Sequence, residues 1–293
     1  MTLKEILDKT TAFFRDKKIE TPRLDAELLL AHGLKLDRIQ LYLRHDQPMK
    51  EDELVILRDL VRRRAQGEPV AYIVGTKEFF GLPFEVSPAV LIPRPETEHL
   101  IEESLAWAKN KKSDLKIIDL GCGSGCIGLT LLKKFPEAQL LAVDMSAQAL
   151  EVAQRNAKAL EVSDRTLFVQ ADAADENLVM SNFKNFMRQD TVDILVSNPP
   201  YIATSDPSVE ENVKKFEPSS ALFAEDDGLA LLKQWSQIYG QHLASEGLML
   251  MEMGMSQGDK MGAHFANLAL FNEVRVIKDL SGHDRVIRGV KHG

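Results

Sequence analysis

The stretch that decides the fold reads KIIDLGCGSGCIGLTLLKK, residues 116–134. Its apolar start, residues 116–120, has the composition of a buried strand and runs directly into a glycine-rich loop, residues 121–125. A helical pattern follows over residues 126–134. Glycines at such a turn let the backbone approach a ligand closely, and the first N–H groups of the helix face that ligand. The order of strand, glycine loop and helix predicts a nucleotide-binding site.

Strand and helix patterns alternate around this loop, from residue 96 to residue 293. Alternation of this kind predicts an α/β domain with a mostly parallel sheet and helices on both faces. The last two strands are too close in sequence for a helical crossover, so we expect them to pair antiparallel. The seven expected strands are 115–119, 139–144, 166–170, 192–197, 247–253, 272–278 and 284–289. The expected helices include 96–109, 126–134, 147–160 and 229–244.

The first part of the chain, residues 1–75, is expected to form an all-helical domain. Apolar residues recur there at helical spacing, and Thr21, followed by a proline, suits the N-cap of a helix. The stretch 70–95 is rich in β-branched and aromatic residues, with glycine and proline between them, and predicts extended chain. We expect a hairpin linker over residues 76–95, ahead of the α/β domain of residues 96–293. The other helices expected in the first domain are 22–33, 37–43 and 51–66.

Length and charge exclude several classes of protein. The chain has 293 residues, 44% hydrophobic and 27% charged, which is enough for two domains with substantial cores. It carries 36 basic and 44 acidic side chains, a formal charge of −8. Residues 76–293 hold 22 of the basic and 31 of the acidic side chains, a net −9. This balance disfavours a protein that binds nucleic acid by neutralising its phosphates.

The remaining composition predicts a protein of the cytoplasm. Cys122 and Cys126 are the only cysteines, too few for a disulfide framework or a zinc site. No apolar run reaches the roughly 18 residues that a membrane span needs. The N-terminus is amphipathic and carries Glu5 and Asp8, so it resembles neither a signal peptide nor a transit peptide.

The residues around the glycine loop indicate which nucleotide it binds. Asp144 ends the next expected strand, where a carboxylate can accept hydrogen bonds from a ribose diol. The loop is G-x-G-x-G rather than the G-x-G-x-x-G of pyrophosphate binders, and Asp119 precedes it. A carboxylate there would repel a diphosphate but tolerate an ammonium group, which favours S-adenosylmethionine. The alternative is an ordinary glycine-rich turn without a ligand.

A second motif, Asn198-Pro199-Pro200-Tyr201, follows the strand expected over residues 192–197. Ligands of open parallel sheets bind beyond the carboxyl ends of the strands, so these residues should meet the ligand of the glycine loop. The Asn198 side-chain carbonyl and the Pro199 backbone carbonyl can both accept hydrogen bonds. Together they would hold a planar NH₂ group with its nitrogen lone pair directed at the methyl carbon, while Tyr201 stacks over that group. The alternative is a proline-rich turn that only leaves a strand.

Catalysis by such a site needs positioning more than acid–base chemistry. The methyl group of S-adenosylmethionine is already activated by its sulfonium, and well-oriented groups can lower a barrier by about 7–11 kcal/mol. We therefore expect no metal ion, and the seven histidines are scattered along the sequence.

With these motifs in place, the chain resembles the release-factor glutamine N5-methyltransferases, the PrmC/HemK family. SNPPY alone is shared with amino-methylating DNA and RNA enzymes, but its combination with IPRPETE is much more specific. The resemblance spans nearly the whole chain and is weakest over residues 1–60. The segments that carry it are GEPVAYIVGTKEFFGLPFEVSPAVLIPRPETE (67–98), DLGCGSG (119–125), AVD (142–144), SNPPYI (197–202) and FEPSSALFAEDDGL (216–229).

The resemblance implies a class I S-adenosylmethionine-dependent methyltransferase fold, Rossmann-like with a seven-stranded sheet. It implies that the glutamine of the Gly-Gly-Gln motif in class 1 peptide chain release factors accepts the methyl group and that S-adenosylhomocysteine is the other product. Residues 1–75 would grip the release factor, although a stabilising cap is the alternative. Asn198 would contact both cofactor and glutamine, and Pro199, Pro200 and Tyr201 would shape the glutamine pocket. The implied cofactor-binding residues are Gly121, Cys122, Gly123, Ser124, Gly125, Asp144 and Asp172.

One departure from the family and one ambiguous arginine stand out. Some members have an aromatic residue after the acidic residue that follows the third strand, whereas here Asp172 is followed by Ala173. Asp172 would still bind the adenine amino group. Arg94 would orient the substrate loop or the domain junction, or pair with Glu96 and Glu98, and we favour a structural role.

Three other functions compete with this one. A DNA or RNA adenine-N6 methyltransferase would have to orient the adenine amino group in the same way. The acidic α/β part and the lack of a separate basic recognition domain count against this function. A glutamine methyltransferase acting on a ribosomal protein would use the same chemistry. A cofactor-binding scaffold without activity is disfavoured by the complete Asn198–Tyr201 motif.

Overall fold

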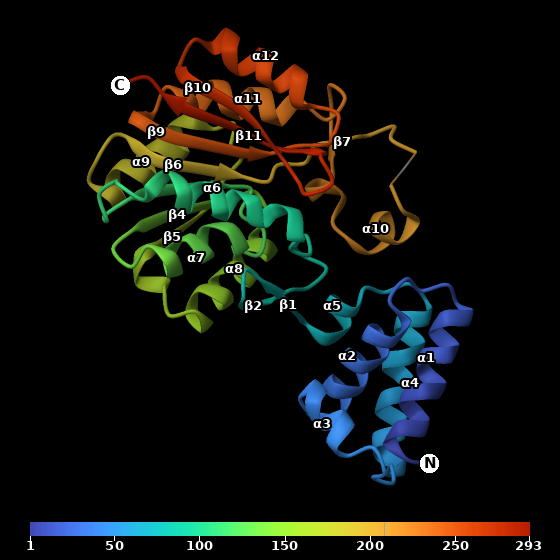
Figure 1. Cartoon of the computed structure of the whole chain (residues 1–293). Coiled ribbons are helices and arrows are strands. Elements are labelled where there is room, and N and C mark those ends of the chain that lie inside the picture. The colour runs from blue at the N-terminus through green and yellow to red at the C-terminus, as the bar shows by residue number, and fades with distance from the viewer. Residues whose placement is uncertain (208) are drawn as a thin grey trace. The chain divides into compact units, whose positions relative to one another are not determined.

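The computed structural model of the chain describes residues 1–207 and 209–293, which fall into two compact units. The helical unit comprises Met1–Thr76 together with Glu211–Phe216. The sheet unit comprises Lys77–Glu210 and Glu217–Gly293. Each unit has its own apolar interior (Figure 1).

The helical unit is built from short amphipathic helices around one core. Leu7, Phe14, Leu30 and Leu41 are fully buried in it. The carboxylate of Asp25 accepts a hydrogen bond from Arg64 at 2.7 Å, which ties α2 to α4. The helices are α1 (Leu3–Asp16), α2 (Pro22–Leu34), α3 (Arg38–Leu43), α4 (Glu51–Ala65), α5 (Val70–Val74) and α10 (Glu211–Phe216).

Two details of this unit differ from expectation. Thr21 is at the N-cap position of α2, but its hydroxyl donates to the Asp25 side chain at 2.7 Å instead of capping a backbone N–H. Residues 70–74 form α5 rather than extended chain, because Tyr72 and Ile73 are buried and Gly75, at φ +80°, ends the helix. The hairpin expected over residues 76–95 begins where it was expected, as β1 (Thr76–Phe79) and β2 (Leu82–Glu85), and ends earlier, since residues 86–94 form no strand.

The sheet unit contains the expected seven-stranded sheet, in the order β10-β11-β9-β6-β3-β4-β5. Neighbouring strands in the run β9-β6-β3-β4-β5 pair parallel. The expected antiparallel pairing of β10 with β11 is confirmed. The strands are β3 (Lys116–Leu120), β4 (Gln139–Asp144), β5 (Thr166–Gln170), β6 (Val192–Ser197), β9 (Leu243–Glu252), β10 (Phe271–Lys278) and β11 (Asp284–Lys291). A small parallel pair, β7 (Ile202–Ala203) and β8 (Phe223–Ala224), lies outside this sheet.

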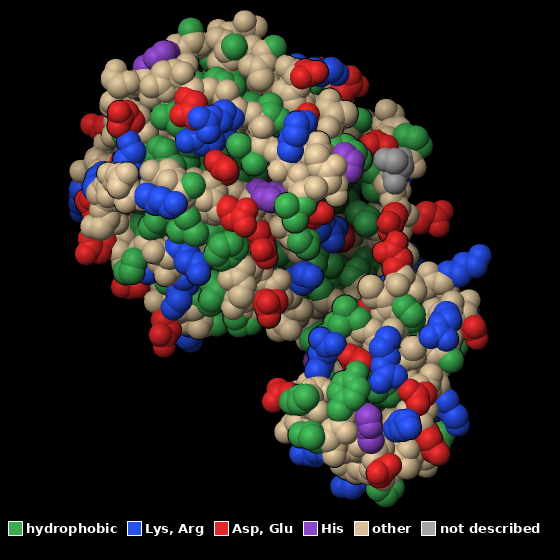
Figure 2. Space-filling model, viewed as in Figure 1, with side chains coloured by type: hydrophobic (Ala, Val, Ile, Leu, Met, Phe, Trp, Pro, Cys, Tyr) green, Lys and Arg blue, Asp and Glu red, His purple; other side chains and the backbone are tan. Residues whose placement is uncertain are grey.

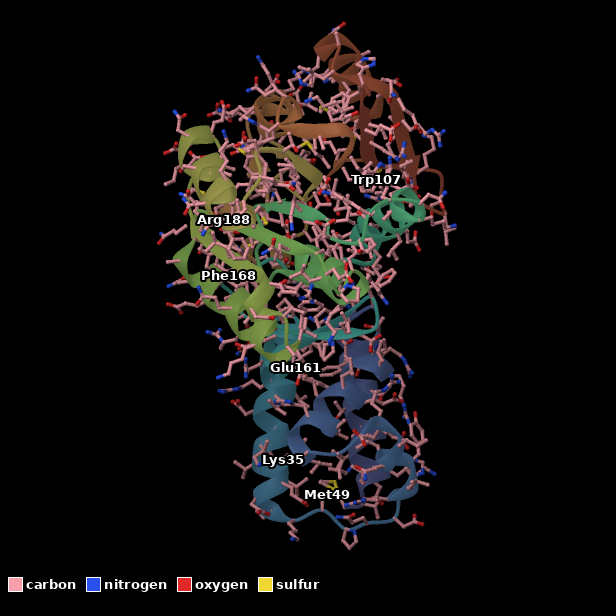
Figure 3. The ribbon with its side chains drawn as sticks, turned by 90° about the vertical axis from the view of Figure 1, so that its left-hand side faces the viewer. Lys35, Met49, Trp107, Glu161, Phe168 and Arg188 are labelled. Atoms are coloured by element: carbon pink, nitrogen blue, oxygen red, sulfur yellow. The ribbon has the colours of Figure 1, made fainter. Side chains whose placement is uncertain are left out.

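Helices cover both faces of the sheet (Figure 1). Successive strand residues point to opposite faces, so Ile117 belongs to one apolar core and Ile118 to the other. Trp107 and Phe168 both border the first core (Figure 3). The first face is covered by α6 (Glu98–Ala108), α7 (Cys126–Lys134) and α8 (Ala147–Ala159), and the second by α9 (Glu176–Met187), α11 (Ala230–Gly240) and α12 (Gly258–Leu268). Single 3₁₀ turns are η1 (Pro95–Thr97), η2 (Ser163–Arg165) and η3 (Ser219–Ala221).

Most expected boundaries are correct to within one or two residues. The helix expected over 229–244 is wrong at its end and the strand expected over 247–253 is wrong at its start, because α11 stops at Gly240 and β9 begins at Leu243. α9, α10 and α12 were not among the named helices, and β7 and β8 are too short to leave a periodic signal in the sequence.

Candidate active site

A cavity of about 290 Å³ lies within the sheet unit, beside the carboxyl ends of β3, β4 and β6. Backbone turns that follow these strands form much of its wall, because parallel strands release their loops at the same edge of the sheet. The residues that line it and carry the argument below are Arg94, Thr97, Gly121, Cys122, Gly123, Ser124, Asp144, Met145, Asp172, Ala173, Asn198, Pro200, Leu231 and Trp235.

The glycine loop has a backbone that only glycine adopts easily. Gly121, Gly123 and Gly125 have φ values of +68°, +53° and +79°. The loop is closed by N–H groups of Gly121 and Cys122, which donate to the Val143 carbonyl at 2.9 and 3.0 Å. Gly125 does not line the cavity: it precedes α7, and an added Cβ there would lie 2.7 Å from Leu129. The loop therefore offers backbone and small side chains to a ligand.

Asp144 joins the loop to the end of β4. Its Oδ2 accepts from the Gly123 N–H and its Oδ1 from the Ser146 N–H, both at 2.9 Å. Burial raises the pKa of Asp144, although these two N–H groups oppose the shift. Each carboxylate oxygen has a second lone pair, so Asp144 can still accept hydrogen bonds from the hydroxyl groups of a ligand in the cavity.

Asp119 is placed differently from the expectation that it stands beside the ligand. It does not line the cavity; it is fully buried behind the loop, where Oδ2 accepts from the Gly128 N–H at 2.9 Å. Its Oδ1 has no hydrogen-bond partner among the residues that the structure describes. Burial raises the pKa of Asp119 to about 7.

The two cysteines are not poised for thiol chemistry. Cys122 and Cys126 are free and buried. Burial raises the pKa of both, that of Cys126 to about 12, so both remain protonated at neutral pH. Over residues 1–207 and 209–293, no group of three or more His, Cys, Asp or Glu side chains could hold a metal ion.

The Asn198–Tyr201 motif follows β6 at the edge of the cavity, and only part of it lines the cavity. Asn198 and Pro200 line the cavity, whereas Pro199 and Tyr201 do not. The Asn198 Nδ2 donates to Thr97 Oγ1 at 3.3 Å. The Tyr201 hydroxyl donates to Glu252 at 3.0 Å, and burial raises the pKa of this hydroxyl.

The Tyr201 backbone is held as firmly as its ring. Gln257 donates from Nε2 to the Tyr201 carbonyl at 3.0 Å. Gly228, at φ +82°, passes so close that an added Cβ would lie 1.9 Å from that carbonyl oxygen. This contact explains the glycine in the EDDG turn ahead of α11.

The wall that follows β5 contains Asp172 and Ala173. Asp172 Oδ1 accepts from the Ala174 N–H at 2.8 Å. An aromatic residue that sequence reasoning missed, Trp235 of α11, lines the cavity close to Gly121, where an added Cβ would lie 3.5 Å from the indole ring. Its apolar periodicity in α11 gave no sign of a ligand contact.

Arg94 also lines the cavity, but neither Glu96 nor Glu98 is its partner. Its guanidinium pairs with Glu217 at 2.6 Å, and the Glu98 carboxylate instead accepts from the Phe80 N–H. The structural role favoured for Arg94 thus has a different partner from the ones expected.

The chain is similar to known proteins over almost its whole length. A family model described as the PrmC N-terminal domain matches residues 5–75, and one described as the methyltransferase small domain matches residues 100–244. The release factor glutamine methyltransferase of Rhodopirellula baltica is 37% identical over 98% of this chain and 95% of that protein. The protein of the same name from Escherichia coli is 34% identical over 92% of each chain.

A solved structure has the same fold over most of the chain. A methyltransferase from Pyrococcus furiosus superimposes with a TM-score of 0.51 at 15% identity, covering 79% of this chain and 98% of that one. A release factor-specific protein-(glutamine-N5) methyltransferase from Alicyclobacillus acidocaldarius covers 72% of this chain and 100% of its own at 29% identity and a TM-score of 0.46. Within the described residues, no helix is long and apolar enough to cross a membrane.

Proposed function

This chain belongs to the family of release factor glutamine methyltransferases, and on that premise we propose how its residues carry out the reaction. The enzyme is a protein-(glutamine-N5) methyltransferase. Its acceptor is the side-chain amide nitrogen of the glutamine in the Gly-Gly-Gln motif of class 1 peptide chain release factors, and S-adenosylmethionine is the donor. It acts in the cytoplasm, where release factors meet the ribosome.

The single observation that carries the proposal is that the glycine loop and Asn198 line the same cavity. A methyl donor bound by the loop and an amide held by Asn198 would therefore share one enclosed space. Bound S-adenosylmethionine would supply an electrophilic methyl group: a nitrogen–carbon bond forms as the sulfur–carbon bond breaks, the sulfonium becomes a neutral thioether, and the amide nitrogen loses one proton to solvent.

The residues at the loop suit that donor. Gly121, Cys122, Gly123 and Ser124 present backbone and small side chains, and Asp144 presents carboxylate lone pairs for ribose hydroxyls. Gly125 sets the start of α7 behind them. Asp172, Met145 and Trp235 form the wall left for the base, so an aromatic surface is supplied from α11 although position 173 is alanine.

The acceptor amide is oriented by the motif after β6. Asn198 Oδ1 lies on a residue that lines the cavity and accepts from its NH₂ group, and Pro200 forms part of the wall behind it. Pro199 and Tyr201 do not line the cavity. The second acceptor, the Pro199 carbonyl, and the stacking of the Tyr201 ring on the planar amide are therefore the parts of the proposal that only a bound glutamine can test. Holding both reactants in line is what lowers the barrier.

We propose further that the helical unit binds the release factor. The PrmC N-terminal domain model covers residues 5–75 of this unit. Ile39, Leu43 and Val55 are 65%, 77% and 57% exposed on α3 and α4, and apolar side chains are visible among the charged ones at the surface of this unit in Figure 2. Single exposed apolar side chains are common on protein surfaces, so the proposal rests on the family match, and these three side chains are the ones to test first.

The main experiment incubates the protein with radiolabelled S-adenosylmethionine and, separately, with release factor, ribosomal proteins, DNA and tRNA. We expect label only on the release factor, and none on a release factor whose Gly-Gly-Gln glutamine is replaced by alanine. Label on nucleic acid and none on the release factor would overturn the proposal. Asn198→Ala should abolish transfer while the thermal midpoint stays near that of the wild type.

The role of the helical unit is tested with Leu43→Ser. We expect the KM for release factor to rise about 10-fold with kcat unchanged, as for an exposed interface side chain. Leu178→Ser is the matched control, because Leu178 is 41% exposed on α9 of the sheet unit and should leave both constants unchanged. An unchanged KM in Leu43→Ser and in Ile39→Ser would assign binding to other residues.

A further inference from the structure

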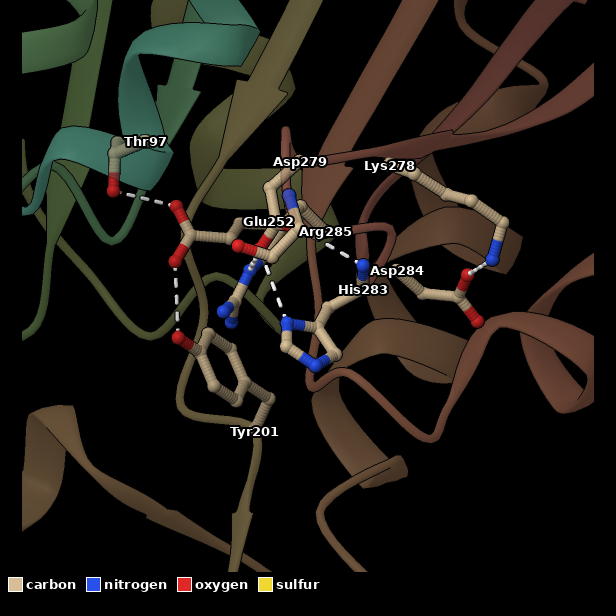
Figure 4. Close-up of polar contacts among 9 residues, drawn as sticks. Thr97, Tyr201, Glu252, Lys278, Asp279, His283, Asp284 and Arg285 are labelled. Carbon is tan, nitrogen blue, oxygen red and sulfur yellow. Dashed lines mark hydrogen bonds and ion pairs between the residues drawn. The ribbon is translucent and has the colours of Figure 1, made fainter.

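Glu252, the last residue of β9, is buried beneath the Asn198–Tyr201 motif with two hydroxyl groups as its partners. It is 1% exposed. Thr97 Oγ1 donates to its Oε2 at 2.5 Å, and the Tyr201 hydroxyl donates to its Oε1 at 3.0 Å (Figure 4). One carboxylate therefore connects η1, β9 and the segment after β6.

The surroundings of Glu252 make it a costly residue to keep for stability alone. Among the described residues, no cationic side chain forms an ion pair with it, since the nearby Arg285 donates to Asp279 at 2.8 Å (Figure 4). Burial raises the pKa of Glu252, against the effect of the two hydroxyls. A buried carboxylate without a cationic partner costs more than a well-packed apolar residue would, which suggests a functional reason for it.

The single hydroxyl proton of Thr97 determines which end of the Asn198 carboxamide points at Thr97. A hydroxyl has one proton, and Thr97 donates its proton to Glu252. The Thr97 oxygen can then only accept from Asn198, so the NH₂ side of the Asn198 carboxamide must point at it, as the 3.3 Å contact has it. The carbonyl oxygen Oδ1 is then on the opposite side of the carboxamide.

We propose that Glu252 and Thr97 are positioning residues that set the orientation of the Asn198 carboxamide, turning Oδ1 toward the substrate amide. The inference rests on the proposed function, which needs Oδ1 as the acceptor for the glutamine NH₂ group. Thr97 and Asn198 line the cavity and Glu252 does not, so Glu252 acts through Thr97. Without this relay, the carboxamide could present its NH₂ group to the substrate NH₂ and repel it.

The test compares Thr97→Val, which keeps the shape and removes the hydroxyl, with Thr97→Ser, which keeps the hydroxyl. We expect kcat for release factor methylation to fall about 10- to 100-fold in Thr97→Val, as for a misplaced reacting group, and Thr97→Ser to restore it to within about 3-fold of the wild type. Calorimetry with S-adenosylhomocysteine should give affinities within about 3-fold for all three proteins.

Thr166→Val is the matched control for lost stability. Thr166 is a buried threonine at the start of β5 whose hydroxyl donates to the Val162 carbonyl at 2.9 Å, away from the cavity. The Thr166→Val variant should lose one buried hydrogen bond, as Thr97→Val does, and keep the kcat of the wild type. Should Thr97→Val fail to fold, Glu252→Gln is the second variant, because its amide can accept from only one of the two hydroxyls and is expected to lower kcat as well.

A second readout does not depend on the reaction. In protein labelled with ¹⁵N at asparagine, the side-chain NH₂ signals of Asn198 are assigned by their loss in Asn198→Asp. Thr97→Val should shift these signals and speed their exchange with water, and Thr166→Val should not. Unchanged Asn198 signals together with wild-type kcat in Thr97→Val would overturn the inference. A wild-type enzyme that leaves the release factor unlabelled would instead overturn the proposed function.

Discussion

Arg94 and Glu217, 123 positions apart in the sequence, form an ion pair in which Nη2 lies 2.6 Å from Oε1. The Glu217 side chain is 2% exposed, and its second oxygen accepts from the Ile92 N–H at 3.3 Å. Arg94 itself lines the cavity, as does Pro218 next to Glu217. The pair therefore joins two parts of the cavity wall that come from the two separate segments of the sheet unit, Lys77–Glu210 and Glu217–Gly293.

We expect this pair to contribute measurably to stability. A double-mutant cycle of Arg94→Met and Glu217→Gln, followed by urea unfolding, should give a coupling of about 1–2 kcal/mol, between the values for exposed and for buried ion pairs. The Arg58–Glu51 pair, with both side chains more than 60% exposed, is the control and should give less than about 0.5 kcal/mol. Equal coupling in the two cycles would mean that burial of Glu217 adds nothing.

Local signals made much of this fold predictable. The run KIIDLGCGSG specifies strand and loop through apolar composition and glycine, and both features act within ten residues. The same holds for the motif that begins at Asn198. By contrast, the β-branched composition of residues 70–74 favoured extended chain, and burial of Tyr72 and Ile73 made a helix there instead.

The parts of the site that sequence reasoning missed are all set by tertiary contacts. Thr97 and Glu252 are 155 positions apart and meet only because η1 and β9 do. Trp235 has the spacing of an ordinary core residue and reaches the glycine loop only through the packing of α11. Asp119 was predicted to lie beside the ligand, but its strand β3 is inside the sheet, between β6 and β4, and its side chain is fully buried.

Asp144 is predicted to bind the ribose diol in addition to holding the loop. The wild type should bind S-adenosylhomocysteine about 10- to 100-fold more tightly than its 2′,3′-dideoxy analogue, as expected when hydrogen bonds to a charged group are lost. Asp144→Asn should bind both ligands weakly and discriminate between them less. Calorimetry measures the four affinities, and equal discrimination in both proteins would limit Asp144 to its contacts with Gly123 and Ser146.

Trp235 is predicted to report ligand binding. Trp107→Phe leaves Trp235 as the sole tryptophan, and its emission should shift when S-adenosylhomocysteine is added. Trp235→Leu should weaken that binding about 3- to 10-fold, the range for loss of an aromatic contact. Trp107→Phe is also the affinity control, since Trp107 lies outside the cavity. An emission that stays constant at saturating ligand would show that the bound ligand does not reach α11.

Asp119 is predicted to make the stability of the ligand-free protein depend on pH. Its pKa is raised to about 7 in the fold by burial, against about 3.9 in an unfolded chain. Between these values the folded state binds more protons than the unfolded state, so stability is fully present below pH 4 and is lost as the pH rises to 7. Asp119→Asn keeps an acceptor for the Gly128 N–H and cannot ionise. The free energy of unfolding of Asp119→Asn should match that of the wild type at pH 4 and exceed it by a few kcal/mol at pH 7.5.

Asp279→Asn is the control of opposite sign, because Arg285 lowers the pKa of Asp279 to about 2. Its loss of stability should be present above pH 4 and shrink as the pH falls toward 2. Urea unfolding across this pH range measures both, and parallel curves for wild type and Asp119→Asn would mean that Asp119 is ionised in the folded protein throughout.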